Sequence, residues 1–102
     1  MNKDLSNLSD IYKLEIASIT TIAADYSLLV TFSNGEVIKY SITHLLKNKL
    51  EVLKDYDIFS RAYIDSLGNI AWDINPDIDS NITWENRIDI SKETIYLKGE
   101  KV

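Results

Sequence analysis

Apolar and polar positions alternate through the first half of the chain, which is typical of half-buried β-strands. Residues 16–22, Ile-Ala-Ser-Ile-Thr-Thr-Ile, are rich in β-branched side chains, which suit a pleated sheet. In residues 26–32 the apolar side chains fall on the even positions, from Tyr26 to Phe32. Together with residues 36–42, these patterns predict an antiparallel meander over residues 15–42.

The turn between the last two predicted strands decides which side chains share a face. A two-residue Asn34-Gly35 loop would pair Val30 with Lys39 and place a lysine on the apolar face. A three-residue loop over 33–35, with Gly35 left-handed, pairs Val30 with Ile38 instead. Because a slip of one residue turns every side chain to the other face, the pattern favours the longer loop. The predicted core face consists of Tyr26, Leu28, Val30, Ile38, Tyr40 and Ile42.

Short helices and a second hairpin are predicted for the rest of the chain. Thr43 and Asp55 can cap short helices within residues 43–60. Strands over 62–65 and 70–73 are expected around a turn at 66–69, and extended segments at 82–84, 88–90 and 94–97. Ser91 is a candidate cap for a short turn.

These elements predict one small α+β domain, an antiparallel β-meander and hairpins with one or two short helices between them. A chain of 102 residues fits a single domain. We place the domain at residues 14–97, with an N-terminal tail or short helix at 1–13 and a C-terminal tail at 98–102.

Several motifs resemble a known family when they are taken in order. They are Leu28-x-Val30-x-Phe32-x-Asn34-Gly35-Glu36, then Leu45-Leu46, Leu53 with Asp55 and Phe59, Ile70-x-Trp72, and Ile88-Asp89-x-Ser91-x-x-Thr94-Ile95-Tyr96. Over residues 14–97 they resemble the small bacterial domain-of-unknown-function family 2442, and the segment from Trp72 to Asp89 resembles a longer variant of it. The resemblance implies a small α+β fold and no assigned biochemical role. Some members carry an added helix-turn-helix that would bind DNA, and we expect no such segment in this chain, which ends at Val102.

The charge balance argues against direct binding to nucleic acid. Sixteen acidic residues oppose eleven basic ones, for a net charge of -5, and the basic residues are scattered. Affinity for nucleic acid comes largely from a basic face that neutralises phosphates. The same negative field suits solubility or a basic protein partner.

The chain contains no cysteine, so thiol catalysis, disulfides and thiolate metal sites are excluded. No stretch approaches the roughly 20 apolar residues of a membrane span, and the first residues lack the apolar run of a signal peptide. We therefore expect a cytoplasmic protein with no membrane association.

The acidic loop 73–79 is the most suggestive segment for ligand binding. Asp73, Asp77 and Asp79 stand at alternate positions with Asn75, as oxygen ligands do in a calcium loop. A calcium loop of the EF-hand type also needs Gly at its sixth position and Glu at its twelfth, where Ile78 and Trp84 stand. We therefore expect a solvated turn held by Asx hydrogen bonds, with the three aspartates as weak candidate metal ligands and no cofactor.

No catalytic motif is evident. His44 is the only histidine and lies beside two leucines, so we expect it to be partly exposed and structural. Gly35, Gly68 and Gly99 are isolated, and they form no phosphate-binding loop. The sequence therefore predicts a protein that is not an enzyme.

The predicted function is that of a non-catalytic protein-interaction or adaptor domain with an unknown protein partner. Its contact surface is placed around Trp72, Asp77, Asp79 and Trp84, because aromatic side chains anchor interfaces. The alternative for the two tryptophans, favoured by burial statistics, is that both pack over the sheet. Alternative functions are an antitoxin-like partner of a neighbouring protein and a module that binds a small molecule or a divalent ion through the acidic loop. The strand at residues 16–22 also allows a homodimer, because few charged residues prevent it from pairing with a second copy.

Overall fold

The computed structural model describes residues 13–102 and has an α+β fold built on two antiparallel sheets. The first sheet has the order β1-β2-β3-β7 and the second the order β4-β5-β6. The predicted N-terminal tail or short helix, apart from Lys13, lies outside the described residues. The strands are β1 (Ile16–Ile22), β2 (Ser27–Phe32), β3 (Val37–Ser41), β4 (Tyr63–Ile64), β5 (Ile70–Asp73), β6 (Arg87–Ile90) and β7 (Glu100–Lys101).

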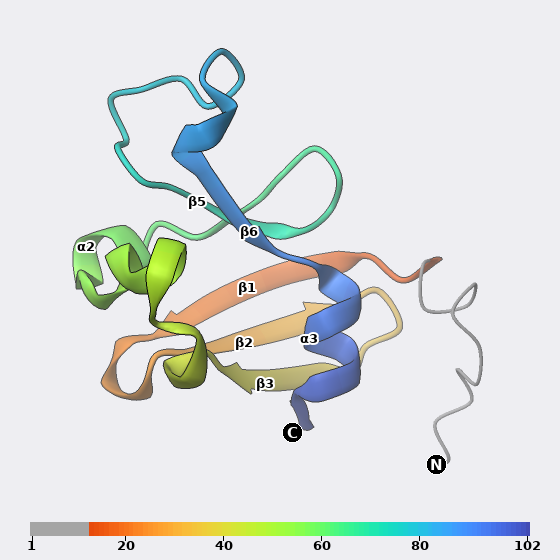
Figure 1. The fold of residues 1–102 in the computed structure, drawn as a ribbon. Coiled ribbons are helices and arrows are strands. Elements are labelled where there is room, and N and C mark those ends of the chain that lie inside the picture. Colours follow the sequence, from red (N-terminus) through yellow and green to blue (C-terminus); the bar gives the residue numbers. More distant parts are fainter. Residues whose placement is uncertain (1–12) are drawn as a thin grey trace.

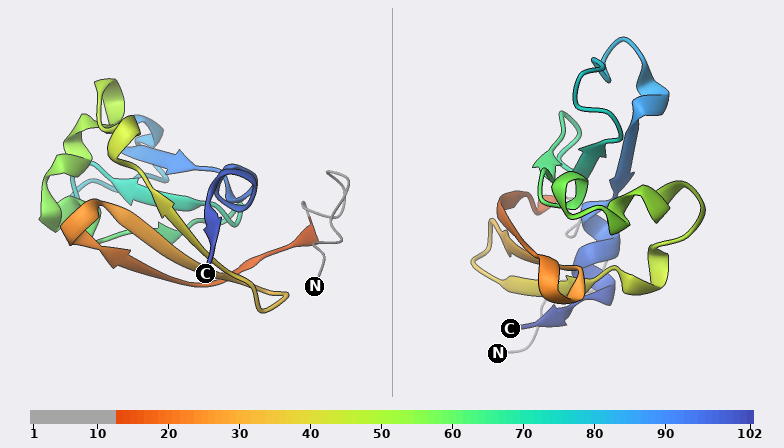
Figure 2. Two further views of the ribbon diagram at one scale, coloured as in Figure 1. Left: turned by 90° about the horizontal axis from the view of Figure 1, so that it is seen from below. Right: turned by 90° about the vertical axis from the view of Figure 1, so that its left-hand side faces the viewer.

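Short helices close the ends of this two-sheet arrangement. The second sheet lies over β1 and β2, with η3 and α2 at one end and α3 at the other (Figures 1 and 2). No helix in the part of the chain that the structure describes is long and apolar enough to cross a membrane. The helices are η1 (Ala23–Asp25), η2 (Thr43–Leu45), η3 (Asn48–Lys54), α2 (Tyr56–Phe59), η4 (Trp84–Asn86) and α3 (Lys92–Lys98).

The meander has the predicted register. Val30 pairs with Ile38 and Leu28 with Tyr40, and Gly35 closes the three-residue loop with a φ of 88°. A glycine tolerates this left-handed conformation without a steric penalty. Five members of the predicted core face are buried and the sixth, Tyr26, packs against them half-buried.

The predicted helix cap at Asp55 and the predicted second hairpin are confirmed. The Asp55 carboxylate accepts a hydrogen bond from the Asp57 backbone N–H at 2.9 Å, which begins α2. Ile64 of β4 pairs with Ile70 of β5. Asp65 accepts bonds from the N–H groups of Leu67 and Asn69 and thereby shapes the turn between these two strands.

The C-terminal part of the chain differs from the prediction. Residues 94–97, expected to be extended, belong to α3, because the Ser91 hydroxyl accepts a hydrogen bond from the Thr94 N–H at 3.1 Å and caps a helix. Ile95 and Tyr96 face the core from this helix. Residues 98–102 were expected to be a tail, but β7 pairs with β3 through Lys39 and Glu100.

Candidate functional site

The connection between β5 and β6 is the most prominent projection of the molecule. β5 ends at Asp73 and β6 begins at Arg87. Residues 74–86, here called the β5–β6 loop, extend beyond the sheets and helices in the views of Figures 1 and 2. Loops held on a rigid scaffold often carry binding residues.

The buried side chain of Asn86 holds the loop together from inside. Its amide nitrogen lies 3.0 Å from the Asn75 carbonyl, 3.1 Å from the Ile78 carbonyl and 3.0 Å from the Ser80 hydroxyl. Its side-chain oxygen accepts a hydrogen bond from the Asn75 backbone N–H at 2.9 Å. One buried amide therefore fixes both sides of the loop, as buried polar groups are expected to be satisfied.

Two Asx turns define the path of the loop above this amide. The Asn75 side-chain oxygen accepts from the Asp77 N–H at 2.9 Å, and Asp79 accepts in the same way from Asn81 at 2.9 Å. The predicted turn held by Asx hydrogen bonds is therefore confirmed. Asp77 and Asp79 themselves are exposed.

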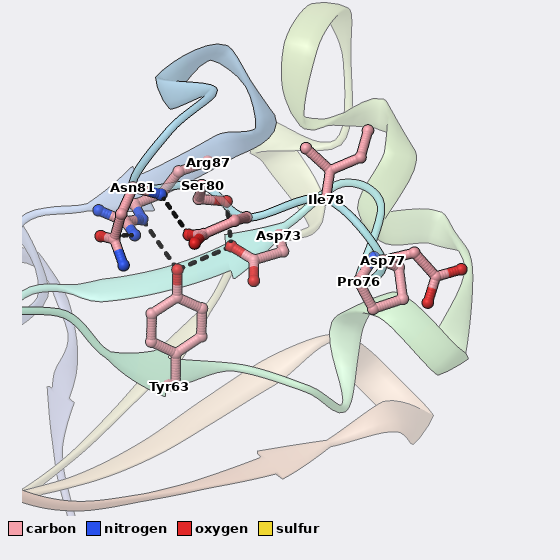
Figure 3. Close-up of a pocket in the computed structure, with 9 residues that line it drawn as sticks. Tyr63, Asp73, Pro76, Asp77, Ile78, Ser80, Asn81 and Arg87 are labelled. Atoms are coloured by element: carbon pink, nitrogen blue, oxygen red, sulfur yellow. Dashed lines mark hydrogen bonds between the residues drawn. The ribbon is translucent and has the colours of Figure 1, made fainter.

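A network of polar side chains forms the base of the loop (Figure 3). The Tyr63 hydroxyl donates to the Asp73 carboxylate at 2.8 Å, and the Ser80 hydroxyl donates to the same oxygen at 2.6 Å. Arg87 donates from Nε to the Tyr63 hydroxyl oxygen at 2.9 Å and from Nη2 to Asn81 at 3.1 Å. Partial burial and the bond to Asp73 raise the pKa of Tyr63, which keeps the phenol a neutral donor.

This network lines an open hollow of about 500 Å³, whose outer wall includes Asp77 and Asp79. The candidate metal ligands do not converge there. The Asp73 carboxylate accepts hydrogen bonds from Tyr63 and Ser80, whereas the Asp79 carboxylate accepts one from the Asn81 N–H of its own Asx turn. Across the described residues, no group of three or more His, Asp or Glu side chains is placed to hold a metal ion.

The second half of the loop carries two large exposed side chains, Ile82 and Trp84, here called the apolar tip. Ile82 is 81% exposed and Trp84 71%. Ile78, in the first half of the loop, is 40% exposed. The Lys49 ammonium of η3 lies 5.9 Å from the centroid of the Trp84 ring, within the range of a cation–π contact. This contact holds the indole on the surface without covering it.

The two tryptophans occupy opposite environments, so neither prediction holds for both of them. Trp72 is fully buried, its indole N–H donates to the Phe59 carbonyl at 2.9 Å, and its ring stacks on that of Phe59. Its place in a contact surface was predicted wrongly, because β5 is the central strand of its sheet. Packing of Trp84 over the sheet was also predicted wrongly, because η4 carries this residue outside the core.

The single histidine lies away from this loop. His44 is exposed on η2, with its ring edge-on to Tyr40 at 5.9 Å between centroids. It borders a second hollow, beside the ion pair between Lys39 and Asp25 at 3.1 Å. The hydrogen bond from the Ser27 side chain, followed by the one from Lys39, lowers the pKa of Asp25.

Sequence reasoning missed the residues that build the base of the loop. Tyr63 comes from β4, whereas Asn86 and Arg87 are neighbours where β6 begins, and the contacts between these two segments depend on the register of β4, β5 and β6. Only the Asx turns at Asn75 and Asp79 could be recognised in the sequence, because these side chains bond to the backbone two residues later.

Comparisons with protein-family models, curated proteins and solved structures find no match to this chain. The resemblance to family 2442 therefore stays a prediction.

Proposed function

We propose that the protein is a non-catalytic interaction domain that binds a basic protein partner through the β5–β6 loop. The observation that carries the proposal is the exposure of Ile82 and Trp84 at the tip of a loop whose base is fixed by hydrogen bonds. Water contact with large apolar side chains is unfavourable, and its removal on binding stabilises a complex.

The loop is suited to binding because its shape is set in advance. Asn86 and the two Asx turns hold the backbone, and Lys49 restrains the Trp84 ring. A preorganised surface loses less conformational entropy on association than a loose one. Tryptophan is also among the residues that most often dominate binding energy at interfaces.

Charge favours a basic partner. Residues 74–86 contain Asp77, Asp79 and Glu85 and no lysine or arginine. The two aspartates are exposed, and the Asp79 backbone carbonyl accepts a hydrogen bond from the Ile82 N–H at 3.0 Å. Lysine or arginine side chains around an apolar pocket on the partner would complement this arrangement and speed association.

The polar groups at the base of the loop support binding better than catalysis. Ser80 is 4% exposed, and its hydroxyl donates to Asp73 and accepts from the Asn86 amide. A nucleophile must reach its substrate and be activated by a nearby base. The one histidine of the chain lies on η2, outside this network.

The test compares capture of partners by the wild type and by the double variant I82A/W84A. Proteins retained from an extract of the source cells are identified by mass spectrometry, and the strongest candidate is purified and titrated against both chains by calorimetry. We expect the double variant to bind about thirtyfold more weakly or worse, the effect of removing an interface hot spot.

The matched control is L67A, because Leu67 is 77% exposed but lies in the turn between β4 and β5. This variant should bind as the wild type does. Retention of the same proteins at the same affinity by I82A/W84A would overturn the proposal, as would the absence of any protein that prefers the wild type.

A further inference from the structure

The turn between β2 and β3 contains the dipeptide Asn34-Gly35. Asn34 is the only asparagine of the chain that is followed by glycine. Both residues are exposed, and no atom lies within 4 Å of the position that a Cβ atom of Gly35 would take. Glycine permits a close approach to its backbone because it has no side chain. The Gly35 nitrogen can therefore be reached by the Asn34 side chain with less hindrance than the nitrogen after any other asparagine.

Hydrogen bonds hold this dipeptide in the native turn. The Gly35 N–H donates to the Phe32 carbonyl at 2.9 Å. The Asn34 side-chain oxygen accepts from the Glu36 N–H at 3.0 Å, and the Asn34 amide nitrogen donates to the Glu36 carboxylate at 2.9 Å. Exposed turns open locally without unfolding of the whole protein. Such an opening frees the Gly35 nitrogen and the Asn34 amide at the same time.

We propose that Asn34 deamidates spontaneously when this turn opens. The Gly35 nitrogen attacks the side-chain carbonyl carbon of Asn34 and forms a cyclic succinimide. The bond from that carbon to the amide nitrogen breaks, and the amide nitrogen leaves as ammonia with the proton of the Gly35 N–H. Water then opens the ring. Cleavage at the side-chain carbonyl gives aspartate, whereas cleavage at the main-chain carbonyl gives isoaspartate.

The reaction changes a contact that holds the C-terminal part of the fold. The Glu36 carboxylate binds Tyr96 of α3 and Lys101 of β7. Asn34 donates a hydrogen bond to the same carboxylate, whereas an ionised aspartate at this position can only accept. Two carboxylates in contact also repel each other. Deamidation therefore weakens the attachment of α3 and β7 to the hairpin.

Isoaspartate changes the backbone as well. It inserts the side-chain methylene carbon of residue 34 into the main chain, within the loop at 33–35 that sets the pairing of Val30 with Ile38. The register of a hairpin depends on the length of its loop. We therefore expect the isoaspartate form to be less stable than the aspartate form.

The first test follows the full chain during storage in mildly alkaline buffer. Replacement of ammonia by water raises the mass of the modified peptide, and peptide mapping by mass spectrometry locates the change. We expect modification at Asn34 before any other asparagine. A chain in which Asn34 stays intact throughout storage, or in which another asparagine reacts first, would overturn the proposal.

The second test measures the consequence with variants. For N34D, which has the aspartate product, we expect the equilibrium constant for unfolding in urea to rise about tenfold, the effect of losing a hydrogen bond to a charged group. In an E36Q background, where residue 36 carries no charge, N34D should change this constant less than about threefold. The control N48D adds the same charge at an exposed residue of η3 and should be as stable as the wild type.

Equal effects of N34D in the wild type and in E36Q would contradict the link to Glu36. An N34D variant as stable as the wild type would contradict the link too. These experiments do not involve the β5–β6 loop, so their outcome is independent of the proposed function.

Discussion

Tyr96 donates a hydrogen bond to the Glu36 carboxylate and ties α3 to the turn between β2 and β3. Lys101 of β7 forms an ion pair with the other carboxylate oxygen, and the Asn34 amide donates to the same carboxylate at 2.9 Å. The hydrogen bond from Lys101, and to a smaller extent the one from Tyr96, lowers the pKa of Glu36 to about 2. Burial and the neighbouring Glu36 raise the pKa of Tyr96 to about 12.

The depressed pKa of Glu36 predicts a loss of stability in acid. A carboxyl group with a lower pKa in the folded state stabilises the fold above its unfolded pKa of 4.5, and this contribution disappears as the pH falls toward about 2. We expect about 2 kcal/mol of the free energy of unfolding to depend on Glu36, after allowance for solvent screening. Urea unfolding between pH 2 and pH 6 measures it.

The variant E36Q should lose most of this pH dependence and be less stable than the wild type at pH 7. E85Q, which removes an exposed carboxylate from the β5–β6 loop, is the matched control and should follow the wild-type curve. Parallel pH curves for E36Q and the wild type would contradict the assignment.

The two tryptophans should differ sharply in their effect on stability. W72A removes a fully buried indole and leaves the Phe59 carbonyl without its donor, so we expect a loss of about 3–5 kcal/mol. W84A removes an exposed side chain and should cost less than about 0.5 kcal/mol. Denaturant titration measures both.

Fluorescence gives an independent check on the same contrast. The emission of the W72F variant, which retains Trp84, should be red-shifted and readily quenched by acrylamide. The W84F variant, which retains Trp72, should emit at shorter wavelength and resist quenching. Equal quenching of the two tryptophans would show that their burial has been assigned wrongly.

Gly99 is required by close packing rather than by its backbone conformation. A Cβ atom at this position would lie 2.3 Å from Ile38 Cγ2 and 2.8 Å from the Ile95 carbonyl oxygen. We expect G99A to destabilise the protein by about 1–3 kcal/mol through overpacking. G35A, whose cost comes from a φ of 88° with nothing within 4 Å, should cost about 1 kcal/mol. Thermal unfolding of both variants tests this order, and a G99A variant as stable as the wild type would contradict it.

Asn86 is predicted to control the order of the β5–β6 loop. N86A removes the donor to Asn75, Ile78 and Ser80 and should cost about 1–3 kcal/mol, because buried polar groups lose their partners. Hydrogen exchange at the Asn75 and Asp77 amides should accelerate. Exchange in the β2–β3 hairpin should stay slow, and faster exchange everywhere would indicate global unfolding instead.

The parts of the fold that depend on neighbouring residues could be predicted from the sequence. The alternation in β2 and β3, together with the glycine turn, was sufficient for the register of the hairpin. The caps at Asp55 and the turns at Asn75 and Asp79 also act over two residues. Such signals are present in the local sequence itself.

Elements that depend on distant contacts could not be predicted. Thr94-Ile95-Tyr96-Leu97 has strand propensity, yet it forms a helix because Ser91 caps it and the core accepts Ile95 and Tyr96. Ile70-Ala71-Trp72 and Ile82-Thr83-Trp84 have the same local pattern. One lies in a central strand and the other in a projecting loop, and only the tertiary structure separates them.

The central claim is that the tip of the β5–β6 loop contacts a protein partner, and site-specific photo-crosslinking in cells tests it most directly. A photoreactive amino acid at position 82 is compared with the same amino acid at position 67, which is equally exposed in another turn. We predict a discrete cross-linked product with another protein from position 82 and none from position 67. The absence of a product at position 82, or the same products from both positions, would contradict the claim.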